Sequence, residues 1–271
     1  MKWISSFLLI LIILTSSAFA SSRTIVFAHG MGVPTGIYSL NKRLTKFFKS
    51  EGYRLLIAKI PAQGTIEKRA AKLNKEIRRL VPFGNFHLIG HSMGGLDARL
   101  ALNKGTFAKR CLSLTTMATP HLGSKVADYV AELSDGKKKI PALLILMINK
   151  IFGGKIENIR NLTTTYMRDK FNFQVSNLPR VDYYSTGYFI ETPVMKSTPI
   201  PWAWLTHKIN VDAGDKHNDG LVSTDRAKWG TYLGSFPGDH WAQTAPIPYK
   251  GKIIYKDVFK KVIDNLKSNY P

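Results

Sequence analysis

The chain has 271 residues, 44% of them hydrophobic, and its lysines and arginines exceed its aspartates and glutamates by 21. A single cysteine excludes an internal disulfide framework. The basic residues are scattered along expected helices without interleaved aromatic residues or zinc-finger spacing, which argues against nucleic acid as a partner. This positive excess is typical either of a soluble basic exported protein or of one attracted to an anionic membrane surface.

The first twenty residues have the pattern of a secretory signal peptide. Lys2 supplies a positive start, residues 3–14 form an apolar run, and residues 18–20 form a small-x-small cleavage site. The apolar run is shorter than the about 20 residues that a bilayer-spanning helix needs. We therefore expect a signal peptide over 1–20, a secreted or periplasmic location, and one folded domain over 21–271, long enough for a sizeable core.

Apolar, β-branched runs alternate with amphipathic stretches along the rest of the chain. Strands are expected at 24–28, 54–58, 86–89, 112–117, 183–189 and 232–236. Helices are expected from Ile37 to Gly52 and at 65–80, 94–103 and 257–266. This alternation predicts an α/β fold with a mostly parallel sheet and helices on both faces. The functional site of such a fold lies beyond the carboxyl ends of the strands.

An insertion at about 125–180 separates two of the expected strands. Within it, three lysines at 137–139 precede the apolar run 140–148, where Pro141 can start a helix that Gly153 and Gly154 end. One interpretation is a helical lid that opens onto lipid while the lysines meet anionic headgroups. The other is a helix buried in the core, and the sequence leaves both open.

Residues 90–94 read Gly-His-Ser-Met-Gly and have the G-x-S-x-G form of a nucleophile elbow. They lie between an expected strand and an expected helix, which is the context that this motif requires. Gly90 and Gly94 provide the small residues needed where the backbone passes close to itself. The turn is expected to hold Ser92 in a strained backbone conformation, with its hydroxyl projecting clear of the sheet.

A serine hydroxyl needs a base to take its proton and an acid to orient that base, here in the chain order Ser, Asp or Glu, His. His240 follows the last expected strand, on a loop that can bring an imidazole over the elbow, so we predict it as the base. His217 is the main rival. His121 precedes most of the acidic residues and is better explained as a polar residue near a strand end.

Asp219 is the predicted acid, because an Asp-Gly turn followed by apolar residues holds its carboxylate rigidly on a loop. Asp239 is adjacent to His240 and poorly placed to face it. Three further aspartates could be solvated loop charges: Asp212, Asp215 and Asp225.

The oxyanion of an acyl-transfer intermediate needs two backbone N–H donors. Met93, directly after the predicted nucleophile, supplies one. Met31, in the loop after the first expected strand, supplies the other, since Gly30 lets that backbone approach closely. His29 is interpreted as a structural hydrogen-bonding residue and not as a base. Cys111 is expected to be simply buried.

The chain resembles the bacterial secreted triacylglycerol lipases of the Pseudomonas and Burkholderia type. The segments that carry the resemblance, from about Thr24 to His240, are His29–Gly32, Gly90–Gly95, Ala118–Ser124 with Val126–Asp128, Leu162–Thr164, Phe171–Asn172, Asn218–Val222 and His240. The resemblance implies an α/β-hydrolase fold, a triad of Ser92, Asp219 and His240, and an oxyanion hole at Met31 and Met93.

Two features depart from that family. Its members often hold calcium through an aspartate two residues after the catalytic histidine, where this chain has Ala242, and they often carry a disulfide, which one cysteine cannot form. We therefore expect no cofactor and no strict calcium requirement. The sequence predicts a serine hydrolase acting on lipid esters. The alternatives are a phospholipase or thioesterase with the same triad, or a non-catalytic hydrolase-fold protein that binds acyl chains or membranes.

Overall fold

The computed structural model describes residues 23–32, 42–136, 141–191, 202–244 and 254–271. The expected signal peptide, the first part of the helix expected from Ile37, and the lysines at 137–139 lie outside these residues. Within the described residues, no helix has both the length and the hydropathy needed to cross a bilayer.

A six-stranded parallel sheet forms the centre of the molecule, with strand order β2-β1-β3-β4-β5-β6. The strands are β1 (Thr24–Ala28), β2 (Arg54–Ile57), β3 (Phe86–His91), β4 (Cys111–Met117), β5 (Asp182–Phe189) and β6 (Thr231–Pro237). Each expected strand is present within about two residues of its predicted bounds. The Cys111 thiol is buried, as predicted.

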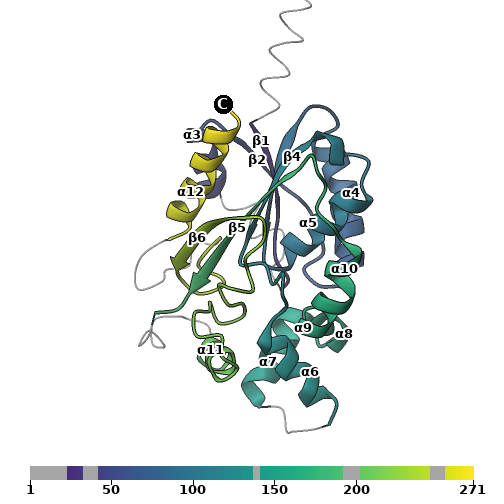
Figure 1. Cartoon of the computed structure of the whole chain (residues 1–271), viewed down its shortest axis with the longest axis vertical. Helices are drawn as coiled ribbons and strands as arrows, with labels where there is room; N and C mark the ends of the chain where they lie inside the picture. The colour runs from purple at the N-terminus through teal and green to yellow at the C-terminus, as the bar shows by residue number, and fades with distance from the viewer. Residues whose placement is uncertain (1–22, 33–41, 137–140, 192–201, 245–253) are drawn as a thin grey trace, which may run out of the picture.

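Helices cover both faces of this sheet (Figure 1). The burial of the side chains of β1 on both faces explains this arrangement. Ile25 and Phe27 belong to a core cluster with α3 (Lys42–Ser50) and α12 (Tyr255–Asn269). Val26 and Ala28 join the cluster on the other face, with α4 (Ile66–Leu80) and α5 (Met93–Lys104). Successive side chains of a strand point to opposite faces, so a continuous apolar run is buried on both. The predicted fold class is confirmed.

The insertion after β4 folds into short helices, most of which the sequence analysis did not predict. They are α6 (Lys125–Ser134), α7 (Ala142–Phe152), α8 (Ile156–Arg160), α9 (Thr164–Tyr166), the π-helical turn η2 (Met167–Phe171) and α10 (Asn172–Gln174). Two other elements were not predicted, the short η1 (Ala108–Arg110) and α11 (Ala203–Asp212). Figure 1 shows α6 to α9 and α11 gathered below the sheet, away from α12.

Helix α7 is the apolar run in which the sequence predicts a helix. Pro141 precedes it, and Gly153 ends it with a φ of +64°. Such a left-handed C-terminal residue is a usual helix stop. Leu144 and Met147 are fully buried, whereas Ile145 is 46% exposed and Leu146 is 39% exposed. The helix therefore has one face in the core and an apolar face in solvent, and the lid motion stays a prediction.

Candidate active site

Ser92 lies between β3 and α5 with a φ of 54° and a ψ of −133°, which is the strained conformation predicted for it. The turn is tight enough to require glycine on both sides. A Cβ atom on Gly90 would lie 2.5 Å from the Cα of Gly95, and one on Gly94 would lie 2.3 Å from the carbonyl oxygen of Ala28. The backbone N–H of Ser92 donates to the carbonyl of Met117 at 2.8 Å, which anchors the turn to β4.

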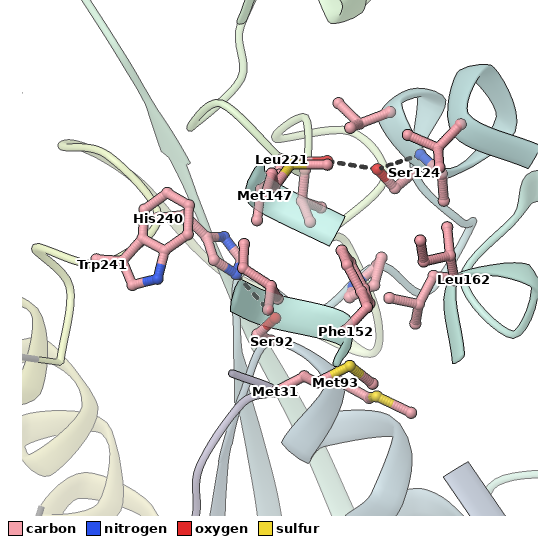
Figure 2. Close-up of a pocket in the computed structure, with 17 residues that line it drawn as sticks. Met31, Ser92, Met93, Ser124, Met147, Phe152, Leu162, Leu221, His240 and Trp241 are labelled. Atoms are coloured by element: carbon pink, nitrogen blue, oxygen red, sulfur yellow. Dashed lines mark hydrogen bonds between the residues drawn. The ribbon is translucent and has the colours of Figure 1, made fainter. Parts of the chain in front are cut away.

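The structure brings three predicted side chains together at this turn. His240 Nε2 lies 2.8 Å from Ser92 Oγ, and His240 Nδ1 lies 2.7 Å from Asp219 Oδ2. A carboxylate can only accept, so Nδ1 carries the imidazole proton and Nε2 accepts from the serine hydroxyl. Figure 2 shows the His240 ring directed at Ser92. A hydroxyl bonded to an unprotonated imidazole nitrogen is the arrangement that activates a serine nucleophile.

Asp219 is held by its own loop as well as by His240. It is fully buried, and its Oδ1 accepts from the backbone N–H groups of Leu221 at 3.0 Å and Val222 at 2.8 Å. Gly220 makes that turn possible with a φ of +98°. The carbonyl of Asp219 accepts from the backbone N–H of His240 at 3.0 Å, so the two loops are joined through backbone and side chain.

The rival histidines lie away from Ser92. His217 is exposed and faces the ring of Phe189, whereas His121 is buried, bonded to Thr116 Oγ1 and stacked on Trp229. The rival aspartates form other contacts. Asp212, Asp215 and Asp225 pair with Lys208, Arg226 and Lys228, and Asp239 accepts from the backbone N–H groups of Trp241 and Ala242.

The loop after β1 lies directly against the nucleophile. A Cβ atom on Gly30 would lie 2.8 Å from the Cβ of Ser92. The adjoining Met31 lines the same pocket as Ser92 and Met93. Met93 is the first residue of α5, and the N–H groups of a helix's first turn have no acceptor within the helix. The two predicted oxyanion donors therefore lie on backbone segments that flank Ser92.

A buried arginine holds this loop in place. Arg69 of α4 donates from Nη2 to the carbonyl of His29 at 2.7 Å and from Nε to Asp97 of α5 at 2.8 Å. Burial and the nearby Arg69 charge lower the pKa of His29 to about 4, so its imidazole is neutral at pH 7. His29 Nδ1 lies 2.8 Å from the carbonyl of Gly30. His29 has the contacts of the structural residue that the sequence analysis expects.

An apolar pocket, partly open to solvent, leads from Ser92 into the inserted helices. Figure 2 shows its side chains converging from several segments of the chain. Met147, Ile151 and Phe152 of α7 form part of its wall, and Trp241 lies beside His240. The sequence marks α7 as apolar, but nothing in the apolar pattern shows which of its residues face Ser92.

The position where the resemblance would place a calcium ligand is apolar. Ala242 is fully buried in a cluster with Ile190 and Ile254, so its side chain offers no oxygen there. Among the described residues, no three His, Cys, Asp or Glu side chains are grouped so that they could hold a metal ion. These residues do not fit a calcium ion at that position, because calcium prefers six to eight oxygen ligands.

Comparison with known proteins agrees with the fold. Residues 59–144 match a family model described as alpha/beta hydrolase fold. Triacylglycerol lipase 2 of Saccharomyces cerevisiae is 34% identical over 198 residues, which cover 70% of this chain and 57% of the yeast protein. A triacylglycerol lipase of Burkholderia plantarii is 31% identical over 134 residues, 44% of this chain and 36% of that protein. The chain thus spans little more than half the length of the yeast relative, and less of the bacterial one.

Solved structures give the same result. The mature Bacillus licheniformis lipase BlEst2 superposes with a TM-score of 0.69 at 21% identity, covering 90% of this chain and 92% of that one. Sheet order, elbow geometry and superposition all point to one architecture. The chain has the α/β-hydrolase fold, and triacylglycerol lipases are among its homologues.

Proposed function

We propose that this protein is a serine hydrolase that cleaves carboxylic ester bonds of lipids. The observation that carries the proposal is the continuous row of hydrogen bonds from Ser92 through His240 to Asp219 at the mouth of an apolar pocket. Such a row makes a nucleophile of a hydroxyl that is otherwise weak at neutral pH. The similarity to curated triacylglycerol lipases supports the same assignment.

In this reaction, Ser92 Oγ attacks the ester carbonyl carbon while His240 Nε2 takes the hydroxyl proton. The negative charge moves to the carbonyl oxygen, where the backbone N–H groups of Met31 and Met93 stabilise it. Asp219 stabilises the imidazolium that forms, and it keeps its own charge throughout. His240 then returns the proton to the departing alcohol, which leaves an acyl group on Ser92. Water, deprotonated by His240, hydrolyses that acyl-enzyme.

The pocket indicates which part of the substrate binds where. Its wall is apolar apart from Ser92, His240 and Ser124, and the Ser124 hydroxyl already donates to the carbonyl of Leu221 at 2.6 Å. A hydrocarbon chain gains free energy on entering such a wall, by about 0.8 kcal/mol per buried CH₂. We therefore place the acyl chain in this pocket and the alcohol part toward solvent.

The charge of the chain favours one variation of this function. An excess of 21 positive charges would attract the protein to an anionic membrane surface. The esters present at such a surface are those of phospholipids. A phospholipase is therefore the second candidate. The motifs further support an exported enzyme of the Pseudomonas and Burkholderia lipase type, made with a signal peptide over 1–20.

The test is hydrolysis of p-nitrophenyl esters of increasing acyl length, and of phospholipid vesicles, by wild type and Ser92→Ala. We expect wild type to hydrolyse both the acetate and longer esters, and Ser92→Ala to lose on the order of 10⁴-fold or more in kcat. Circular dichroism is recorded in parallel to check that the variant is folded. Activity of folded Ser92→Ala within tenfold of wild type would overturn the assignment of the nucleophile. Faster turnover of phospholipid than of neutral ester would favour the second candidate.

A further inference from the structure

Gln243 is a fully buried side chain that contacts Asp219, the acid of the proposed triad. Its Nε2 donates to Asp219 Oδ2 at 2.8 Å, the same oxygen that His240 Nδ1–H contacts at 2.7 Å. The other oxygen, Oδ1, is taken by two backbone N–H groups of its own loop. Four donors therefore surround one carboxylate, and Gln243 is the only side-chain donor besides His240 among the hydrogen bonds described for it.

His91 fixes which way the Gln243 amide points. This residue ends β3 directly before Ser92, and its Nε2 lies 3.2 Å from Gln243 Oε1 and 3.0 Å from the carbonyl oxygen of His240. Both partners are acceptors, so Nε2 carries the proton. Burial, with a further contribution from His240, lowers the pKa of His91 to about 3, and the ring is neutral at pH 7.

These contacts form a closed ring of hydrogen bonds. The ring runs from His91 to the amide of Gln243, on to Asp219, then to the imidazole of His240, and back from the His240 carbonyl to His91. It links the strand before the nucleophile to the loops of the acid and the base. A neutral His91 closes this ring without placing a second positive charge beside the His240 imidazolium, whose ring centroid is 4.9 Å away.

We infer that Gln243, oriented by His91, is a positioning residue that sets the direction of the Asp219 carboxylate toward His240. This inference rests on the proposed function. Rotation of the carboxylate moves the imidazole away from Ser92, and a misplacement of about 1 Å can cost on the order of 10²-fold in rate.

Two substitutions separate this role from simple packing. Gln243→Met keeps the length of the side chain and removes its hydrogen bonds, whereas Gln243→Glu changes the amide into a carboxyl that can donate only when protonated. Gln174, which is exposed on α10 far along the chain from these loops, provides the matched control as Gln174→Met. The titratable groups that surround position 243 are His91 of β3, Asp219 and His240, with Tyr188 of β5 near Asp219.

Kinetics on p-nitrophenyl acetate test this role. We expect Gln243→Met to lower kcat by roughly tenfold to a hundredfold with KM within about threefold, because a misdirected acid affects the transition state more than binding. We also expect the ratio of kcat for Gln243→Glu to kcat for Gln243→Met to fall as pH rises, since an ionised Glu repels Asp219. A packing role would leave kcat of Gln243→Met, which keeps the side-chain length, close to that of Gln174→Met.

Ser92→Ala, assayed in parallel, keeps the two claims apart. If Ser92→Ala is inactive but Gln243→Met matches Gln174→Met and the ratio stays flat with pH, the positioning role is wrong and the proposed function stands. If Ser92→Ala keeps its activity, the proposed function itself fails. If Gln243→Met does not fold by circular dichroism, the comparison of Gln243→Glu with wild type across pH decides, because these two side chains differ in one terminal atom.

Discussion

Ser92 combines a left-handed backbone with a hydroxyl aimed at an imidazole. A residue in such a conformation costs on the order of 1–3 kcal/mol, and it persists only where the surroundings hold it there. The hydrogen bond of its N–H to β4, and the close approach of Gly94 to the end of β1, supply that restraint. Strain at this residue keeps the hydroxyl at the edge of the pocket, where an ester carbonyl can reach it.

At the same scale, the identity of the acid can be tested by comparing aspartates. We expect Asp219→Asn to lower kcat by on the order of 10⁴-fold, because an amide can stabilise neither the required tautomer nor the imidazolium. Asp215→Asn and Asp225→Asn, whose carboxylates pair with Arg226 and Lys228, should stay within a few-fold of wild type. If Asp215→Asn proves the most damaging of the three, the acid has been misassigned.

The residues of the site differed in how far the sequence could predict them. Motif, chain order and turn chemistry selected Ser92, His240 and Asp219. Ser92 and His240 each follow a strand end, and Asp219 precedes a glycine in a turn. Gln243 carries no such signal, since its role depends on two loops meeting in space. His91 occupies the first variable position of the G-x-S-x-G motif, which gives no sign of its role. Its contact with Gln243 spans 152 positions of the chain.

At the scale of an element, one face of α7 lines the pocket and another face is exposed to solvent. Met147 is buried against the pocket, and Ile145 stands 46% exposed on the other side. The Cα of Ile151 lies 2.9 Å from where a Cβ on Gly32 would be, so the helix also packs on the loop that carries Met31. Any movement of α7 would therefore change both the pocket and the backbone beside the nucleophile.

Filling the pocket from α7 should change acyl selectivity. We expect Met147→Trp to lower kcat/KM for p-nitrophenyl decanoate by tenfold or more relative to the acetate, because the larger side chain takes the space of the chain. Overpacking costs about 1–3 kcal/mol, so the melting temperature is measured alongside. Ile145→Trp is the matched control and should leave the decanoate-to-acetate ratio unchanged for monomeric substrate. Equal ratios in both variants would move the acyl chain out of this pocket.

The core elements were easier to predict from sequence than the inserted ones. Strands such as β1 are buried on both faces and read as continuous apolar runs, which makes them conspicuous. Helices α8 and α9 have five and three residues, too few for a periodic pattern to appear. Asp128 of α6 accepts from both the backbone N–H and the hydroxyl of Thr164, a distant contact that fixes α9 and leaves no local signature.

At the scale of the whole molecule, buried histidines link stability to pH. Burial lowers the pKa of His29 to about 4 and of His91 to about 3, and it lowers that of His121 well below 6.5. Below pH 6.5 the unfolded chain therefore binds three protons that the folded chain excludes. Burial has the opposite effect on Asp97, raising its pKa to about 7 against the pull of Arg69, so the folded state retains one proton there.

The balance is about two protons taken up on unfolding, so the free energy of unfolding should fall as pH drops from 6.5 toward 4, by about 2–3 kcal/mol per pH unit. Urea denaturation at pH 7, 6, 5 and 4 measures this. His121→Gln should reduce the slope by about one proton. Stability that holds constant or rises toward pH 4 would show that these histidines are not excluded from protonation.

The central claim is that Ser92 is an activated nucleophile, and covalent labelling tests it most directly. A fluorophosphonate reacts with a serine hydroxyl that an adjacent base activates, and mass spectrometry of the digested protein locates the adduct. We predict one label per chain, on the peptide containing Ser92, with no labelling of Ser92→Ala and slow labelling of Asp219→Asn. A folded wild-type protein that takes up no label, or carries it on another residue, would contradict the account.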